Sequence, residues 1–293
     1  MQVKVTFRKW MFSPVLPGDA MAKMILNVDH PSVPDLRRTI EDINSKIEDF
    51  RDAEFRRIER QIQQREASSV DAFVTGEEEQ RYHMTLRVIA FLESERHHFQ
   101  QFLDDRAYFL GPVFAGSGLY RKEARNDDQD FLLDWALIQI RQERLGKNKP
   151  FLYGATTQQL VVAGLPLEAF FKQEKLLKAT NSEMVVFKSG RSTSITQAKF
   201  HGLKSVLITR EPIPMYGTFR LVTTWEYAFA SISEGPFAEP GDSGTFVSTR
   251  LGGVVGLLWG GAERNDIGYV TPIEAVFDDI KKVTGAVEVR IAS

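Results

Sequence analysis

The sequence contains no cysteine. This absence excludes a disulfide framework, a thiolate zinc site and a cysteine nucleophile. Secreted enzymes of modest size often depend on disulfides, so the lack of cysteine favours a reducing compartment, and we expect a cytosolic protein. The first ten residues carry charge but no apolar core, and they therefore do not have the pattern of a signal peptide.

Long apolar runs and a strong net charge are also missing. No run approaches the length of a transmembrane helix, so we expect no membrane partner. The 37 basic and 39 acidic residues give a formal net charge of -2, which does not favour nucleic acid as a partner. No phosphate loop or cofactor fingerprint appears, and the adjacent His97 and His98 lack the helical spacing of a metal site. We therefore expect neither a cofactor nor a metal.

Between residues 35 and 68 there is neither glycine nor proline. Apolar residues recur there every three or four positions, from Leu36 to Ile62, which predicts a helix with one apolar stripe. A second helical stretch covers about 77–104. The short connection between them predicts an antiparallel helical hairpin over about 34–105. A coiled-coil arm through which the protein self-associates is the alternative, because it would bury the same stripe.

The rest of the chain is largely β in character. Of all 293 residues, 43% are apolar, which is enough for a substantial core. Short apolar runs separated by turn residues favour a barrel. Two amphipathic helices are expected, at 165–179 and 272–283. The expected strands are 3–7, 21–28, 108–114, 131–140, 183–188, 205–209, 218–232, 245–248, 253–259 and 267–270.

Residues 239–247 read EPGDSGTFV and contain the pattern with the clearest chemistry. A serine hydroxyl becomes a nucleophile when a base takes its proton and donors hold the oxyanion that forms. Glycines on both sides of Ser243 would let the backbone turn so that two N–H groups point at one spot. A strand, rather than a helix, follows, which separates the motif from the α/β-hydrolase elbow. The alternative is a polar turn between two strands.

In this context the chain resembles the trypsin-like serine peptidases of the chymotrypsin fold, and its lack of cysteine is similar to fungal intracellular members. The resemblance rests on five stretches: 134–138, 187–196, 241–244, 257–261 and 268–272 followed by a helix. It implies a mainly β protein, a chymotrypsin-like double β-barrel with a C-terminal helix. The first barrel would occupy 1–145, incomplete at its N-terminus and carrying the helical hairpin. The second would occupy 146–293.

The resemblance also implies roles for individual residues. Ser243 would be the nucleophile, and Asp134 would orient the base. The backbone around Gly241, Asp242 and Ser243 would form the oxyanion hole. A substrate pocket would be lined by Phe237, Trp259, Gly260 and Gly268. The two glycines would leave its walls open to a large side chain, and Phe237 at its floor would disfavour a basic one.

The catalytic base is the residue for which the resemblance is weakest. In these peptidases the triad runs histidine, aspartate, serine along the chain. Among the five histidines, His83, His97 and His98 fall on the second predicted helix and His201 follows Asp134. His30 is the remaining candidate, although it has Asp29 and Pro31 beside it instead of small residues.

Two hypotheses therefore stay open. The first is an active endopeptidase that cleaves polypeptides with His30 as base. The second is a peptidase-fold protein that lacks the catalytic base, because the chain begins too late or has diverged at its start. Such a protein would bind a protein partner through the helical hairpin. Without a partner histidine, desolvation would raise the pKa of Asp134.

Overall fold

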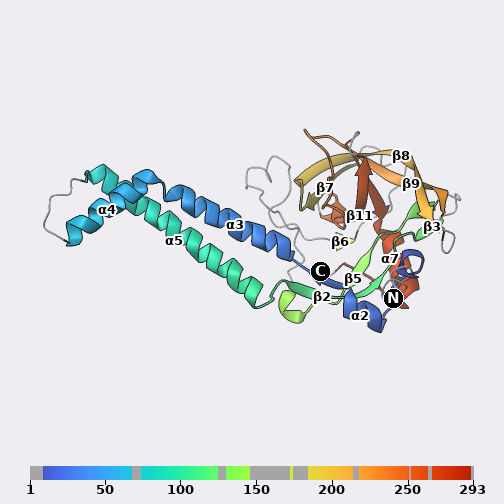
Figure 1. Ribbon diagram of the computed structural model, residues 1–293. Helices are drawn as coiled ribbons and strands as arrows, with labels where there is room; N and C mark the ends of the chain where they lie inside the picture. Colours follow the sequence, from blue (N-terminus) through green and yellow to red (C-terminus); the bar gives the residue numbers. More distant parts are fainter. Residues whose placement is uncertain are drawn as a thin grey trace. The chain divides into compact units, whose positions relative to one another are not determined.

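The structure is a computed structural model of the 293-residue chain. It describes residues 9–67, 74–124, 130–145, 172–173, 184–213, 218–250, 252–262 and 266–291. The chain divides into two compact units, a helical unit of residues 27–111 and a β unit of residues 1–26 and 112–293 (Figure 1). In the described ranges, no helix is long and apolar enough to cross a bilayer.

The β unit contains a closed antiparallel barrel. Its strands run in the order β10-β7-β8-β9-β12-β11, and β11 also pairs with β10, which closes the sheet on itself (Figure 1). The bounds are β7 (Val185–Gly190), β8 (Ser194–Pro212), β9 (Phe219–Ser231), β10 (Phe246–Ser248), β11 (Gly253–Ala262) and β12 (Ile267–Pro272). The expected chymotrypsin-like β architecture is confirmed.

Two predictions fall partly or wholly outside the described ranges. The expected strand at 3–7 lies outside them, as does most of the expected helix at 165–179. Within the latter range, β6 (Lys172–Gln173) is a short strand that pairs in parallel with β11.

The barrel interior is filled by aromatic and aliphatic side chains. The rings of Phe200 and Phe229 lie 5.3 Å apart, and Phe229 is stacked on Phe237 at 6.5 Å. Such aromatic contacts add to the free energy gained by burying apolar surface. Around them pack the buried residues Val186, Ala198, Val247, Val255, Leu258 and Val270.

The single strand expected at 131–140 is wrong. Two short strands, β4 (Asp130–Leu132) and β5 (Ala136–Ile138), replace it, because the backbone between them bonds elsewhere. The N–H of Trp135 donates to Ser117 Oγ at 3.1 Å, and the Ser117 N–H donates to the Trp135 carbonyl at 2.9 Å. Strand β3 (Lys122–Ala124) pairs with β4, and β5 pairs with β2 (Phe109–Gly116). A 3-10 turn follows at Gln142–Arg144.

The strand expected at 21–28 is also wrong for most of its length. Residues Ala20–Ile25 form helix α2, and only Asn27–Asp29 form a strand, β1. The cause is a helix cap at Asp19, whose Oδ1 accepts hydrogen bonds from the N–H groups of Met21 at 3.0 Å and Ala22 at 3.1 Å. A capping aspartate accepts hydrogen bonds from backbone N–H groups that otherwise have no partner in the first turn of a helix.

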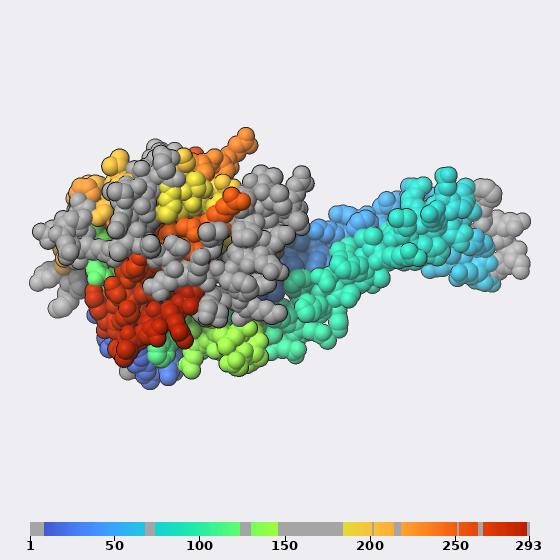
Figure 2. Space-filling model, turned by 180° about the vertical axis from the view of Figure 1, so that it is seen from behind, coloured from blue at the N-terminus to red at the C-terminus, as the bar shows by residue number. Residues whose placement is uncertain are grey.

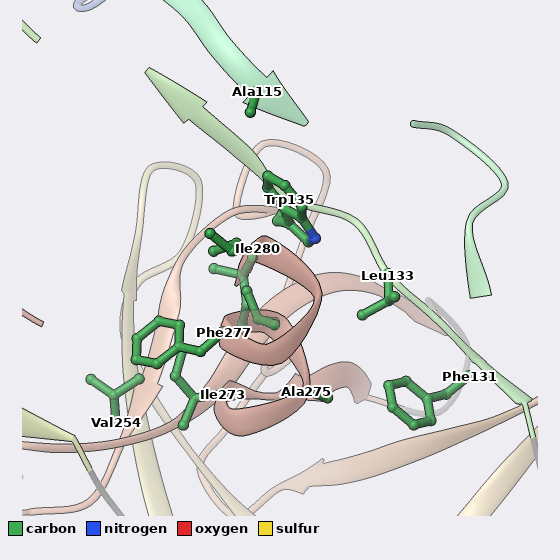
Figure 3. Packing of buried hydrophobic residues seen from close by; sticks show 11 residues of the cluster. Ala115, Phe131, Leu133, Trp135, Val254, Ile273, Ala275, Phe277 and Ile280 are labelled. Atoms are coloured by element: carbon green, nitrogen blue, oxygen red, sulfur yellow. The ribbon is translucent and has the colours of Figure 1, made fainter. Parts of the chain in front are cut away.

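The C-terminal helix α7 (Ile273–Thr284) confirms its prediction, and its apolar face is buried (Figure 3). Asp279 ties this helix to the segment that carries Asp134. Its carboxylate accepts a forked pair of bonds from Arg121, at 2.8 and 2.6 Å, and a bond from the Trp135 indole at 2.9 Å. Leu133 and Trp135 pack in the same cluster as this helix, so both neighbours of Asp134 are anchored.

The helical unit contains α3 (Val33–Phe50), α4 (Ala53–Ala67) and α5 (Gly76–Asp104), which confirms the expected hairpin. The first predicted helix is interrupted at residues 51–52, where Asp52 Oδ1 accepts the Phe55 N–H at 2.7 Å and caps α4. The core of the unit is the buried cluster Ile43, Ile47, Phe55 and Ile89.

Candidate active site

The loop from residue 239 to residue 245 places Ser243 at a corner of the backbone. The Asp242 N–H donates to the Glu239 carbonyl at 3.0 Å, which closes a turn. Gly241 and Gly244 have φ angles of 105° and 88°, in the left-handed region that glycine adopts without a steric penalty. The glycines on either side of Asp242 and Ser243 are therefore a requirement of the loop geometry.

Strand β11 is hydrogen-bonded to the two residues that follow Ser243. The Gly244 N–H donates to the Leu258 carbonyl at 2.8 Å, and the Leu258 N–H donates to the Thr245 carbonyl at 3.0 Å. Ser243 itself is exposed, and its hydroxyl donates to the Trp259 carbonyl at 3.0 Å. A peptide carbonyl is not a general base, so this contact orients the hydroxyl without activating it.

The N–H groups of Gly241 and Ser243 are the donors predicted to form the oxyanion hole. Within the ranges that the structure describes, neither of them donates a hydrogen bond. A side chain at position 241 would collide with Ser192, since an added Cβ would lie 2.5 Å from its Oγ. Among the described residues, the loop thus leaves two backbone donors, one on each side of Asp242, without an acceptor beside an exposed hydroxyl.

A cavity of about 130 Å³ adjoins Ser243. Its lining residues are Ala238, Glu239, Pro240, Ser243, Leu258, Gly260 and Gly261. Of the predicted pocket residues, Gly260 lines it. Ligand pockets commonly measure 300–1,000 Å³, so this cavity matches one small side chain better than a whole organic ligand.

The other three predicted pocket residues lie outside this lining. Phe237 is fully buried, and its ring fills the space beside Gly268, where an added Cβ would lie 2.6 Å from the ring. The ring of Trp259 stacks on Tyr269 with 5.6 Å between centroids. The wall at Gly268, expected to be open to a large side chain, is therefore closed by Phe237.

Asp134 lies between β4 and β5, in the segment anchored by Trp135. Its residue surface is exposed, yet desolvation by the surrounding protein raises the pKa of its carboxyl above the usual value. In the described part of the chain, it has no hydrogen bond or ion pair, so no cation opposes this shift. The direction is the one expected for an aspartate without a charged partner.

His30 follows β1 in the helical unit, whereas Ser243 and Asp134 belong to the β unit. Its N–H donates to the Tyr108 carbonyl at 2.7 Å, and the residue is exposed. Its role as base stays a prediction. The other histidines on α5, at positions 83, 97 and 98, are exposed, and the side chain of His201 lies outside the described set.

Sequence reasoning missed Lys188. Its Nζ lies 2.7 Å from Asp242 Oδ2, and both side chains are fully buried next to the nucleophile loop. Burial alone would raise the pKa of Asp242, but hydrogen bonds from Lys188 and the Ser192 N–H outweigh it and lower that pKa. The sequence contained one signal for it: Lys188 lies two residues after Val186, and therefore on the same face of strand β7 as this buried residue.

No group of three or more histidine, aspartate or glutamate side chains suited to a metal ion occurs within the ranges described above. Glu226, on β9, is a buried carboxylate whose Oε1 accepts the Leu132 N–H at 3.1 Å. Burial raises the pKa of Glu226. It supports the strand that precedes Asp134 and does not line the cavity.

Comparisons with known proteins give one family match. The sequence model of peptidase family S64 matches residues 39–289. No curated protein sequence matches the chain.

Among solved structures, the chain is similar to the Rv3671c protease of M. tuberculosis. An inactive serine-to-alanine mutant of Rv3671c aligns at 19% identity and a TM-score of 0.29, over 42% of this chain and 57% of that one. The active form aligns at 21% identity and a TM-score of 0.28, over 42% and 51%. The chain thus spans little more than half the length of these proteins.

Proposed function

Because the chain belongs to peptidase family S64, a family of serine peptidases, we propose that it is an endopeptidase in which Ser243 is the nucleophile. The observation that carries the proposal is the loop geometry. An exposed hydroxyl lies beside two N–H groups that have no partner among the described residues, and a small cavity adjoins it.

In the proposed reaction, Ser243 Oγ forms a bond to the scissile carbonyl carbon while an imidazole takes its proton. The negative charge moves to the carbonyl oxygen, where the N–H groups of Gly241 and Ser243 stabilise it. The imidazolium gives the proton to the leaving amine, and water then hydrolyses the acyl-enzyme. We assign the imidazole to His30 and its orientation to Asp134.

The substrate is a polypeptide with a small side chain at the residue whose carbonyl is attacked. The argument is the volume of the cavity, about 130 Å³, which is bounded by Ala238, Pro240 and Leu258. The ring of Phe237 fills the space beside Gly268, so the cavity does not extend there. One additional methylene in such a pocket changes discrimination by roughly 10- to 200-fold. A reducing, intracellular location is part of the same proposal, because the chain has no cysteine to oxidise.

A fluorophosphonate probe tests the proposal, since it forms a bond with an activated serine. Incubation of the native protein, followed by proteolysis and mass spectrometry, should place the adduct on Ser243. Heat-denatured protein is the control and should carry none. Absence of the adduct in the native protein, or equal modification of the control, would remove the proposal. In the same assay His30→Gln should label at least tenfold more slowly, and an unchanged rate would exclude His30 alone.

A non-catalytic interaction through the helical hairpin is the second candidate. Helix α5 carries apolar residues on the face opposite its core contacts: Met84, Val88 and Phe91 are 60%, 39% and 63% exposed. Their i, i+4, i+7 spacing is that of a helix–helix contact. Figure 2 shows the side chains of α5, in cyan, at the surface of this unit. Self-association through this stripe is the form of contact we propose.

Light scattering tests the second candidate. The protein should have a mass above that of one chain, and the Met84→Gln/Phe91→Gln variant should return to the mass of one chain. Gln101→Ala, at an exposed position near the C-terminal end of the same helix and outside the stripe, is the control and should keep the larger mass. A parent protein with the mass of a single chain at all concentrations would contradict the candidate.

A further inference from the structure

The carboxylate of Asp242 is the most heavily bonded group near Ser243. Its Oδ2 accepts bonds from Lys188 Nζ at 2.7 Å, Thr193 Oγ1 at 2.8 Å and the Glu239 N–H at 3.1 Å. Its Oδ1 accepts the N–H groups of Ser192 at 2.7 Å and Thr193 at 3.4 Å. Five donors from three segments therefore converge on one buried side chain.

Lys188 supplies the positive charge in this cluster. Besides the bond to Asp242, its Nζ contacts Thr193 Oγ1 and lies 3.5 Å from the Ser194 carbonyl, so all three ammonium protons have acceptors. Burial lowers the pKa of Lys188, which disfavours its charge, whereas the pKa of Asp242 is lowered, which favours the carboxylate. We conclude that the pair is charged, because every donor and acceptor of both groups faces a matched partner.

The hairpin between β7 and β8 is shaped to receive this pair. At Gly190 an added Cβ would collide with Asp242 Oδ1 and lie 2.8 Å from Lys188 Nζ, so only glycine fits. The next turn of the hairpin contributes Ser192, whose Oγ donates to the Pro240 carbonyl at 2.6 Å. The hairpin thus contacts the loop 239–244 at two residues, Pro240 and Asp242.

Asp242 stands between the two residues whose N–H groups face no described partner. When the side chain of Asp242 is held, the peptide groups before and after Asp242 are also restrained, because only two soft dihedral angles separate these two groups. We propose that Lys188 is a positioning residue: its buried ammonium holds Asp242, and thereby the loop 239–244, so that Gly241 and Ser243 present their N–H groups. The inference rests on the proposed function of Ser243.

The test is Lys188→Met, which keeps the length of the side chain and removes the charge. Labelling by the fluorophosphonate probe should slow by at least 100-fold, as expected when an oxyanion donor is misplaced. In peptide assays the loss should fall mainly on kcat rather than on KM. Lys281→Met, at the surface of α7, is the control and should behave as the parent.

A second variant separates positioning from unfolding, since a lone Asp242 carboxylate could destabilise the barrel. Lys188→Met/Asp242→Asn removes both charges of this pair and should fold. It should still label slowly, and the amide hydrogens of residues 239–245 should exchange at least tenfold faster than in the parent. Parent-like labelling and exchange in this variant would overturn the role of Lys188. A parent protein that does not label would instead overturn the proposed function, and the exchange measurement would still decide on Lys188.

Discussion

Replacement of Ser243 by alanine is expected to lower kcat for peptide hydrolysis by about 10⁶-fold, the loss seen when the nucleophile of a serine peptidase is removed. Stability should change by only about 0.5–1.5 kcal/mol, because the exposed hydroxyl makes one bond, to the Trp259 carbonyl. Steady-state kinetics with a peptide substrate and urea unfolding measure the two quantities on the same preparation.

Ser231→Ala is the matched control for this experiment. Its hydroxyl also donates one bond to a carbonyl, that of Ser233 at 3.1 Å, and it lies on β9 away from the loop. The control should keep full activity and lose a similar, small amount of stability. If Ser243→Ala kept more than a hundredth of the parent rate, the nucleophile would have to be another group.

Replacement of Phe237 by alanine is expected to lower the free energy of unfolding by about 3–5 kcal/mol. The ring is fully buried, stacks on Phe229 and fills the space beside Gly268. Its removal leaves a void next to Leu258, which also lines the cavity at Ser243. The same variant should therefore accept larger substrate side chains, seen as a rise of at least tenfold in kcat/KM for large relative to small residues.

Phe237→Leu is the milder comparison, because it keeps most of the apolar volume. It should lose clearly less stability than the alanine variant in urea unfolding and should retain the preference for small residues. A loss below 1 kcal/mol for Phe237→Ala would mean that the ring does not support the barrel. An unchanged substrate preference in a folded Phe237→Ala protein would separate Phe237 from specificity.

Local patterns were sufficient for the elements with a strong period. The helical hairpin, the terminal helix α7 and most barrel strands follow from the spacing of apolar residues, because burial of one face decides their structure. The predictions of secondary structure are wrong where a single polar contact outweighs the pattern of apolar residues. Asp19 caps helix α2 in an apolar stretch that was predicted to be a strand. Ser117 takes the backbone hydrogen bonds of Trp135, so the predicted strand is divided into β4 and β5.

The residue pattern alone was enough to predict the class of protein and the turn at Ser243, because a glycine–aspartate–serine–glycine sequence before a strand is a local property. The residues that surround this turn depend on contacts between segments far apart in the sequence. Lys188 reaches Asp242 across 54 residues, and Phe237 meets Gly268 only once β12 lies in the barrel. Contacts of this kind depend on strand register and burial, which the spacing of residues along the chain does not specify.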